Sequence, residues 1–299
     1  MEKQKIYDHF TKGLDQEFRG WIGSEIETHF IDGNGKPITV DCSQQIFRVL
    51  VESGWKILKR KNSLITEIEK GGARILYELG RQNIEIATPP AEHNFLVEVI
   101  KLLLAELYAA ACLCDAYPLF APIMESDEDL LVIPDERDAS WLELDGRENL
   151  TPLSTTSSVQ FTLETKGPNN AISLLNDLAD VRKHLLFSNP YVQDKIWRKY
   201  IQNSNAGYKK SRYGVVRPNS IEHYVDLLSV HDVVINGKLV PFPIAEQENI
   251  DLFLRSVWWN FRLRRYNDRL CIEVRTFSRR GDDQIFSDLL FFVMNHYCI

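Results

Sequence analysis

Residues 21–31 read WIGSEIETHFI, and this stretch decides what kind of fold the chain can form. Glu25 and Glu27 stand two residues apart in a run with Ile26 and Phe30, which is the spacing of a β-strand. Successive side chains of a strand point to opposite faces, so both carboxylates project from the same face. Two like charges side by side inside a fold are costly unless something offsets them. We therefore expect this pair to face a ligand.

Three further segments repeat the division into an apolar and a polar face. Residues 83–90, NIEIATPP, alternate until their prolines, and residues 157–164, SSVQFTLE, alternate throughout. Residues 261–277, FRLRRYNDRLCIEVRTF, predict two strands joined by a turn at 266–268, which is typical of an antiparallel hairpin. The polar faces of these segments carry Asn83, Glu85, Ser158, Gln160, Thr162, Glu164, Arg262, Arg264, Glu273 and Arg275.

The remaining pattern predicts an α+β fold. Short strands are expected at 55–60, 64–69 and 73–79, and helices at 41–54, 94–116, 170–187 and 191–202. The helix at 94–116 places apolar side chains at Phe95, Val99, Leu102, Leu103, Leu107 and Ala110. Strands that neighbour helices without regular βαβ alternation indicate α+β rather than a doubly wound sheet. The 299 residues contain no internal repeat, so we expect one domain over residues 1–299.

Composition excludes several classes of function. The formal charge of −7 gives no support to binding of nucleic acid or of an anionic membrane surface. No run approaches the ~20 apolar residues of a membrane span, and the N-terminus lacks the apolar core of a signal peptide. Five scattered cysteines argue against a disulfide framework, and Cys112 and Cys114 are interpreted as small buried hydrophobes. We therefore expect a reducing, cytoplasmic setting.

The polar strand faces have two interpretations. They are either the solvated outer face of an ordinary antiparallel sheet, or the lining of one site. Glu, Gln, Asn and Arg recur on these faces with almost no Lys, which favours a site. Mg²⁺ prefers hard oxygen ligands such as carboxylates and phosphates, and arginine grips phosphate in two places. Together these parts would make a phosphoryl-transfer centre.

The ordered series of motifs resembles the glutamate–cysteine ligases and related carboxylate–amine ligases of the glutamine synthetase superfamily. The resemblance is carried by GSEIETHF (23–30), ELGRQNIEIATPP (78–90), SSVQFTLE (157–164), SNPYV (188–192), SRYGVV (211–216), IEHYVDLL (221–228) and FRLRRYNDRLCIEVRTF (261–277). It implies a curved, mainly antiparallel sheet with helices on its outer face. It also implies a ligase that binds ATP, an amino acid and an amine with two or three Mg²⁺ ions. The acid is activated as an acyl phosphate and joined to the amine, glutamate and cysteine being the family default.

The resemblance also implies roles for individual residues. Metal ligands would be Glu25, Glu27, Glu78, Glu85, Gln160 and Glu273. Arg275 would lie beside the transferred phosphate, and Arg212 would be a loop arginine that contacts substrate or phosphate. Substrate or ATP would be bound by Arg262, Arg264, Thr162 and Asn83. We accordingly expect Glu273→Gln to abolish turnover with the fold intact.

Several departures keep other functions open. Thr162 is short and uncharged, Asn83 stands where a Gln is frequent, and most members of the family are longer. A non-catalytic relative that binds a nucleotide or an amino acid is one alternative, and a kinase of guanidino compounds is another. The identities of acid and amine, and whether the chain forms a homo-oligomer, also stay open.

Other polar and aromatic residues receive structural interpretations. None of the seven histidines has metal-ligand spacing, although His29 would share the strand face of Glu25 and Glu27. Of the neighbouring Trp258 and Trp259, one is expected in the core, while the other would be free to wall an adenine.

Overall fold

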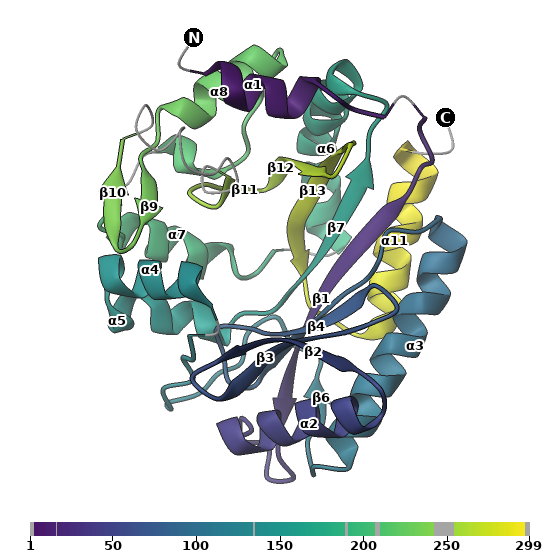
Figure 1. Ribbon diagram of the computed structural model, residues 1–299, viewed down its shortest axis with the longest axis vertical. Coiled ribbons are helices and arrows are strands. Elements are labelled where there is room, and N and C mark those ends of the chain that lie inside the picture. Colours follow the sequence, from purple (N-terminus) through teal and green to yellow (C-terminus); the bar gives the residue numbers. More distant parts are fainter. Residues whose placement is uncertain are drawn as a thin grey trace.

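The fold is α+β, as predicted, with one large antiparallel sheet at its centre (Figure 1). The computed structural model describes residues 3–15, 17–133, 135–188, 191–206, 210–241 and 254–296. The sheet runs in the order β12-β13-β7-β1-β5-β4-β3-β2, and β6 also pairs with β1. Its strands are β1 (Ile22–Ile31), β2 (Lys56–Lys61), β3 (Leu64–Lys70), β4 (Ala73–Tyr77), β5 (Asn83–Ala87), β6 (Tyr117–Leu119), β7 (Ser158–Glu164), β12 (Phe261–Tyr266) and β13 (Arg269–Ser278).

Helices cover the apolar face of this sheet. In Figure 1, α3 and α11 run beside each other along it, and both contact the main core. The helices of this layer and its edges are α1 (Gln4–Thr11), α2 (Val40–Glu52), α3 (His93–Cys112), α6 (Pro168–Ser188), α8 (Ile221–Ser229) and α11 (Asp282–His296). Ile26, Phe161 and Ile272 project from three neighbouring strands into that core and are fully buried. Their burial leaves the alternate residues of the same strands on the opposite, polar face.

A smaller layer lies over the polar face. It consists of α4 (Glu136–Asp145), α5 (Arg147–Leu150), a 3₁₀ turn (Thr151–Thr155), α7 (Asp194–Asn203), a second 3₁₀ turn (Lys210–Arg212), and two two-stranded sheets, β9 (Val233–Ile235) with β10 (Lys238–Val240) and β8 (Tyr213–Gly214) with β11 (Trp258–Trp259). This layer has its own aromatic core around Trp141 and Tyr200. α4 has no counterpart among the predicted helices, because its acidic residues hide the apolar spacing.

Two details of the outer layer differ from the predictions. On α3, Phe95 and Leu102 are 65% and 66% exposed, because the buried stripe is rotated onto Leu96, Ile100 and Leu103. Cys112 is exposed as well, so its interpretation as a buried hydrophobe was wrong. Within the described part of the chain, no helix is long and apolar enough to cross a membrane.

Candidate active site

Strand register brings the predicted polar residues onto one face of the sheet. Glu27 of β1 pairs with Glu85 of β5, and Glu25 pairs with Gln160 of β7. On the other side of β7, Glu273 of β13 pairs in turn with Arg262 of β12. Paired residues of an antiparallel ladder point to the same side, so these six side chains share one surface. The interpretation of the strand faces as one site, rather than as separate solvated faces, agrees with this arrangement.

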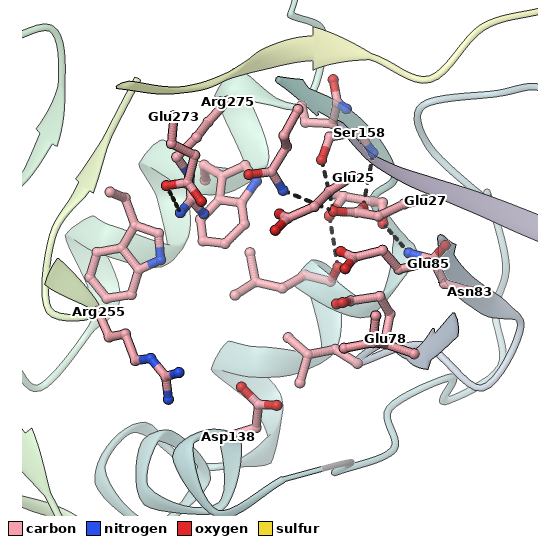
Figure 2. Close-up of a pocket in the computed structure, with 18 of the residues that line it drawn as sticks. Glu25, Glu27, Glu78, Asn83, Glu85, Asp138, Ser158, Arg255, Glu273 and Arg275 are labelled. Carbon is pink, nitrogen blue, oxygen red and sulfur yellow. Dashed lines mark hydrogen bonds and ion pairs between the residues drawn. The ribbon is translucent and has the colours of Figure 1, made fainter. Parts of the chain in front are cut away.

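That surface forms the floor of a cavity of about 650 Å³, which Figure 2 shows in close-up. Ten of the twelve residues predicted for the site line it: Glu25, Glu27, Glu78, Asn83, Glu85, Gln160, Arg262, Arg264, Glu273 and Arg275. The smaller layer supplies the opposite wall, including Asp138 of α4 and Trp258 of β11. The cavity therefore lies between the sheet and the smaller layer.

Four glutamates form an acidic group on β1, β5 and the end of β4, and we call it the carboxylate group: Glu25, Glu27, Glu78 and Glu85. Glu85 is 7% exposed, and its pKa is raised well above the usual value by burial and then by the charges of the other three. Burial also raises the pKa of Glu27. Two hydrogen bonds from Ser158, one from its backbone N–H at 2.9 Å and one from its Oγ at 2.8 Å, lower this pKa but do not cancel the effect of burial. The group therefore favours either protons or a bound cation.

Glu25 is the member of the carboxylate group whose pKa is also influenced by arginines. Burial raises its pKa, as does the charge of Glu273, whereas Arg275, Arg264 and Arg262 lower it. The net pKa of Glu25 is still raised. Glu25 thus marks the border between an acidic and a basic half of the cavity.

The basic half is organised around Glu273, which is 3% exposed. Arg262 contacts one oxygen of Glu273 through Nε at 2.7 Å and Nη2 at 2.5 Å, and Arg275 reaches the same oxygen at 3.3 Å. Burial opposes ionisation of Glu273, but the charges of Arg262, Arg275 and Arg264 outweigh it and hold its pKa at about 2. Arg262 also donates to the Leu254 carbonyl at 2.5 Å, and burial lowers its own pKa to about 10. Glu273 is therefore engaged by arginines, and its role as a metal ligand stays a prediction.

Two amide side chains next to the carboxylate group offer free oxygens. Gln160 uses Nε2 to contact Glu27 at 3.4 Å, and Asn83 uses Nδ2 to donate to the Thr156 carbonyl at 2.9 Å. The buried Oε1 of Gln160 and Oδ1 of Asn83 accept no hydrogen bond from the described residues. Unsatisfied buried carbonyl oxygens beside carboxylates are the donor set that Mg²⁺ prefers. The described residues nevertheless contain no group of three or more His, Cys, Asp or Glu side chains arranged closely enough to hold a metal ion by themselves.

Arg212 and Thr162 do not line the cavity. Arg212 is 1% exposed and donates to the carbonyls of Ser256 at 2.7 Å and Asp232 at 3.3 Å. These bonds hold together two loops of the smaller layer, and a contact of Arg212 with substrate stays a prediction. Thr162 lies on β7 between Gly23 of β1 and Glu273 of β13, two residues after Gln160, which does line the cavity.

His29 and the tryptophan pair have resolved roles. Thr155 O lies 3.0 Å from His29 Nε2 and Gln82 Nε2 lies 3.2 Å from its Nδ1, and burial lowers the pKa of His29 to about 4. It is a neutral structural residue. Trp259 is fully buried and donates to the Ser211 carbonyl, Trp258 is half-buried, and both line the cavity.

Sequence reasoning missed several residues of the cavity. Ser158 was placed on the polar face but received no role, although its spacing from Gln160 was sufficient to put both beside Glu27. Asp138 and Arg255 lie in segments without strand alternation, so no pattern linked them to the site.

Comparisons with known proteins assign no family. No protein-family model and no curated protein sequence matches the chain. Among solved structures, the chain is similar to a bifunctional glutathione synthetase from Pasteurella multocida, with a TM-score of 0.46 and 14% sequence identity. The similarity covers 99% of this chain and 41% of that one, so this chain spans about two fifths of the length of its structural neighbour.

Proposed function

We propose that this protein is an ATP- and Mg²⁺-dependent carboxylate–amine ligase built on a glutamine synthetase-like sheet. The observation that carries the proposal is the division of one cavity into two halves. The carboxylate group forms one half, where acidic side chains raise one another's pKa, and Arg262, Arg264 and Arg275 form the other half around Glu273. A site that must hold both metal cations and phosphates needs this pairing of charges.

The residues present fit a magnesium site on the acidic half. Glu25, Glu27, Glu78 and Glu85 would hold the ions, together with the free Oε1 of Gln160. When bound, Mg²⁺ would neutralise phosphate charge and orient the nucleotide. Glu273 is left out of this set, because arginines already surround its carboxylate.

The reaction would proceed in two steps. A carboxylate oxygen of the acid attacks the γ-phosphorus of ATP, the bond from phosphorus to the ADP oxygen breaks, and an acyl phosphate forms. The amine nitrogen then attacks the acyl carbon, the bond from carbon to the phosphate oxygen breaks, and amide, phosphate and a proton are released. Glutamate, the family default, is our choice for the acid.

The arginines would act on the first step. Arg275 is half-buried and faces the cavity, and its guanidinium is held by Glu273 at 3.3 Å. A fixed positive charge at this place would stabilise the negative charge that develops on the transferred phosphoryl group. Arg264 faces the same cavity and would bind the remaining phosphate oxygens.

The test is ADP release from Mg²⁺-ATP with each of a panel of amino acids, in the presence of hydroxylamine. Hydroxylamine is a small neutral nucleophile that converts an acyl phosphate into a hydroxamate. We expect hydroxamate with one acid, identified by mass, and none without Mg²⁺. A stable phosphorylated product would instead identify a kinase, and ATP binding without any turnover would identify a non-catalytic binding protein.

A further inference from the structure

The wall opposite the sheet carries a second kind of chemistry. Five aromatic residues that form the core of the smaller layer also line the cavity, and we call them the aromatic wall: Trp141, Trp197, Tyr200, Tyr213 and Trp258. Trp258 is their centre, with ring centroids at 4.8 Å from Trp141, 5.6 Å from Tyr200 and 6.2 Å from Trp197. Transfer of a phosphoryl group needs charges and metal ions, so this wall has no part in it.

The aromatic wall offers carbon rather than hydroxyl groups to the cavity. Tyr200 donates its hydroxyl hydrogen to Asp145 at 2.8 Å, and Tyr213 donates to Asp194 at 2.7 Å. Asp145 is itself buried and also accepts from Ser204 Oγ and from the Asn205 backbone. Because both phenol groups are bound within the protein, the wall presents ring faces and edges to a ligand. Such a surface binds an apolar or aromatic group.

Two charged side chains stand beside the aromatic wall. Asp138 is 5% exposed and lies one helical turn before Trp141 on α4, and its charge contributes, after burial and Asp145, to the raised pKa of Tyr200. Arg255 is exposed, and Figure 2 shows both side chains reaching into the cavity away from the carboxylate group. Within the described part of the chain, Arg255 makes no hydrogen bond or ion pair.

We infer that this side of the cavity binds the amine substrate, and that this substrate is an α-amino acid with a large apolar or aromatic side chain. Arg255 would bind its carboxylate, Asp138 its amino group, and the aromatic wall its side chain. The inference rests on the proposed function, and it departs from the cysteine of the family default. A small thiol side chain would leave most of the aromatic wall without contact.

An adenine ring is the competing occupant, and the geometry favours the amino acid. A neutral base meets neither the charge of Asp138 nor that of Arg255, whereas a zwitterion meets both. The rings next to Trp258 also cross it at 62° for Trp141 and 85° for Tyr200, so they form a box rather than two parallel faces for stacking.

The first experiment measures kcat/KM for a series of amines at saturating ATP and acid. We expect phenylalanine and tryptophan to exceed cysteine and alanine by about tenfold or more. Phenylalanine should also exceed phenethylamine, which lacks only the carboxylate. Hydroxylamine does not need this pocket. Hydroxamate formation without any preference among amino acids would therefore overturn this inference alone, whereas absence of hydroxamate would overturn the proposed function.

Substitutions at two positions, Arg255 and Trp258, locate the effect. Arg255 is exposed, so Arg255→Gln should fold normally and should reduce the preference for phenylalanine over phenethylamine by about tenfold. Trp258→Ala should raise KM for phenylalanine about tenfold, and Trp258→Phe should restore much of the affinity. Tyr117→Ala is the matched control, because Tyr117 is an aromatic residue of β6, 45% exposed and outside the cavity lining. An increase in KM for ATP rather than for phenylalanine in Trp258→Ala would assign the wall to the nucleotide and overturn the inference.

Discussion

Glu85 and Glu273 occupy equivalent places on two sides of one sheet face and are in opposite electrostatic states. Both are buried, both line the cavity, and both were predicted to bind metal. The pKa of Glu85 is raised well above its usual value by burial and by neighbouring carboxylates, whereas three arginines hold the pKa of Glu273 at about 2. The charges of the neighbouring side chains, more than burial itself, therefore decide whether a buried carboxylate favours a bound cation or is already paired with a cationic side chain.

The largest expected effect is on the stability of Glu273→Gln. The pair of Glu273 and Arg262 is buried, with side chains only 4% and 7% exposed. Removing one partner of such a pair leaves the other charge uncompensated and costs roughly 3–5 kcal/mol. We expect the melting temperature to fall by on the order of 10 °C. This replaces the expectation from sequence that the fold would stay intact.

The double variant Glu273→Gln with Arg262→Gln is the control for this prediction. If the loss comes from an uncompensated arginine, the double variant should be more stable than the sum of the two single variants by about 1–3 kcal/mol. Strict additivity in thermal denaturation would contradict the pairing.

Arg275→Gln should mainly reduce the rate of the reaction. Arg275 is half-buried, and its contact with Glu273 is longer than that of Arg262, so its loss should affect the fold less. Removal of one charge-stabilising donor typically lowers kcat by roughly 10²–10³-fold. Hydroxamate formation under saturating ATP and acid measures this. Arg217→Gln, which breaks an exposed ion pair with Asp180, is the matched control and should have wild-type kcat; equal losses in both variants would contradict the assignment.

The strand positions of the candidate site residues could be predicted from the sequence. Alternation placed Glu25 and Glu27 on one face of a strand, and the local hairpin placed Arg262 and Glu273 on adjacent strands, where the structure pairs them. Strand periodicity depends only on neighbouring residues, so these predictions needed no knowledge of the fold.

Features that depend on distant contacts could not be predicted in this way. Arg212 was expected in the site, but the carbonyls of Ser256 and Asp232 that bury it are 44 and 20 residues away in sequence. Asp138 lies on a helix whose position over the sheet is set by the aromatic packing of Trp141 with Trp258. The ion pairing of Glu273 depends on two strands meeting side by side, and the sequence pattern alone did not separate an arginine partner from a metal ion.

Glu85→Gln should have the opposite effect on stability to Glu273→Gln. In the metal-free protein at pH 8, this substitution removes a charge that burial and the neighbouring glutamates oppose. We expect the melting temperature to rise by roughly 2–4 °C, the equivalent of about 1 kcal/mol. We also expect the stabilisation of the wild type by Mg²⁺ to be lost in this variant. A variant that melts at or below the wild-type temperature without metal would contradict the account of the carboxylate group.

The smallest effect is the pH dependence of stability, and its sign differs between the two glutamates. The folded pKa of Glu273 is lowered from 4.5 to about 2, so its contribution to stability is present above pH 4.5 and is lost as pH falls towards 2. The folded pKa of Glu85 is raised, so the native state binds more protons than the unfolded chain above pH 4.5 and loses stability as pH rises. His29, with a pKa of about 4, acts in the same way in wild type and variants, and its contribution cancels in their difference. Denaturant titrations between pH 3 and 9 without Mg²⁺ give the free energy of unfolding as a function of pH. The acid limb of this curve should be less steep in Glu273→Gln, and its alkaline limb should be less steep in Glu85→Gln. The same limb flattened in both variants would mean that one electrostatic environment, and not two, surrounds the cavity.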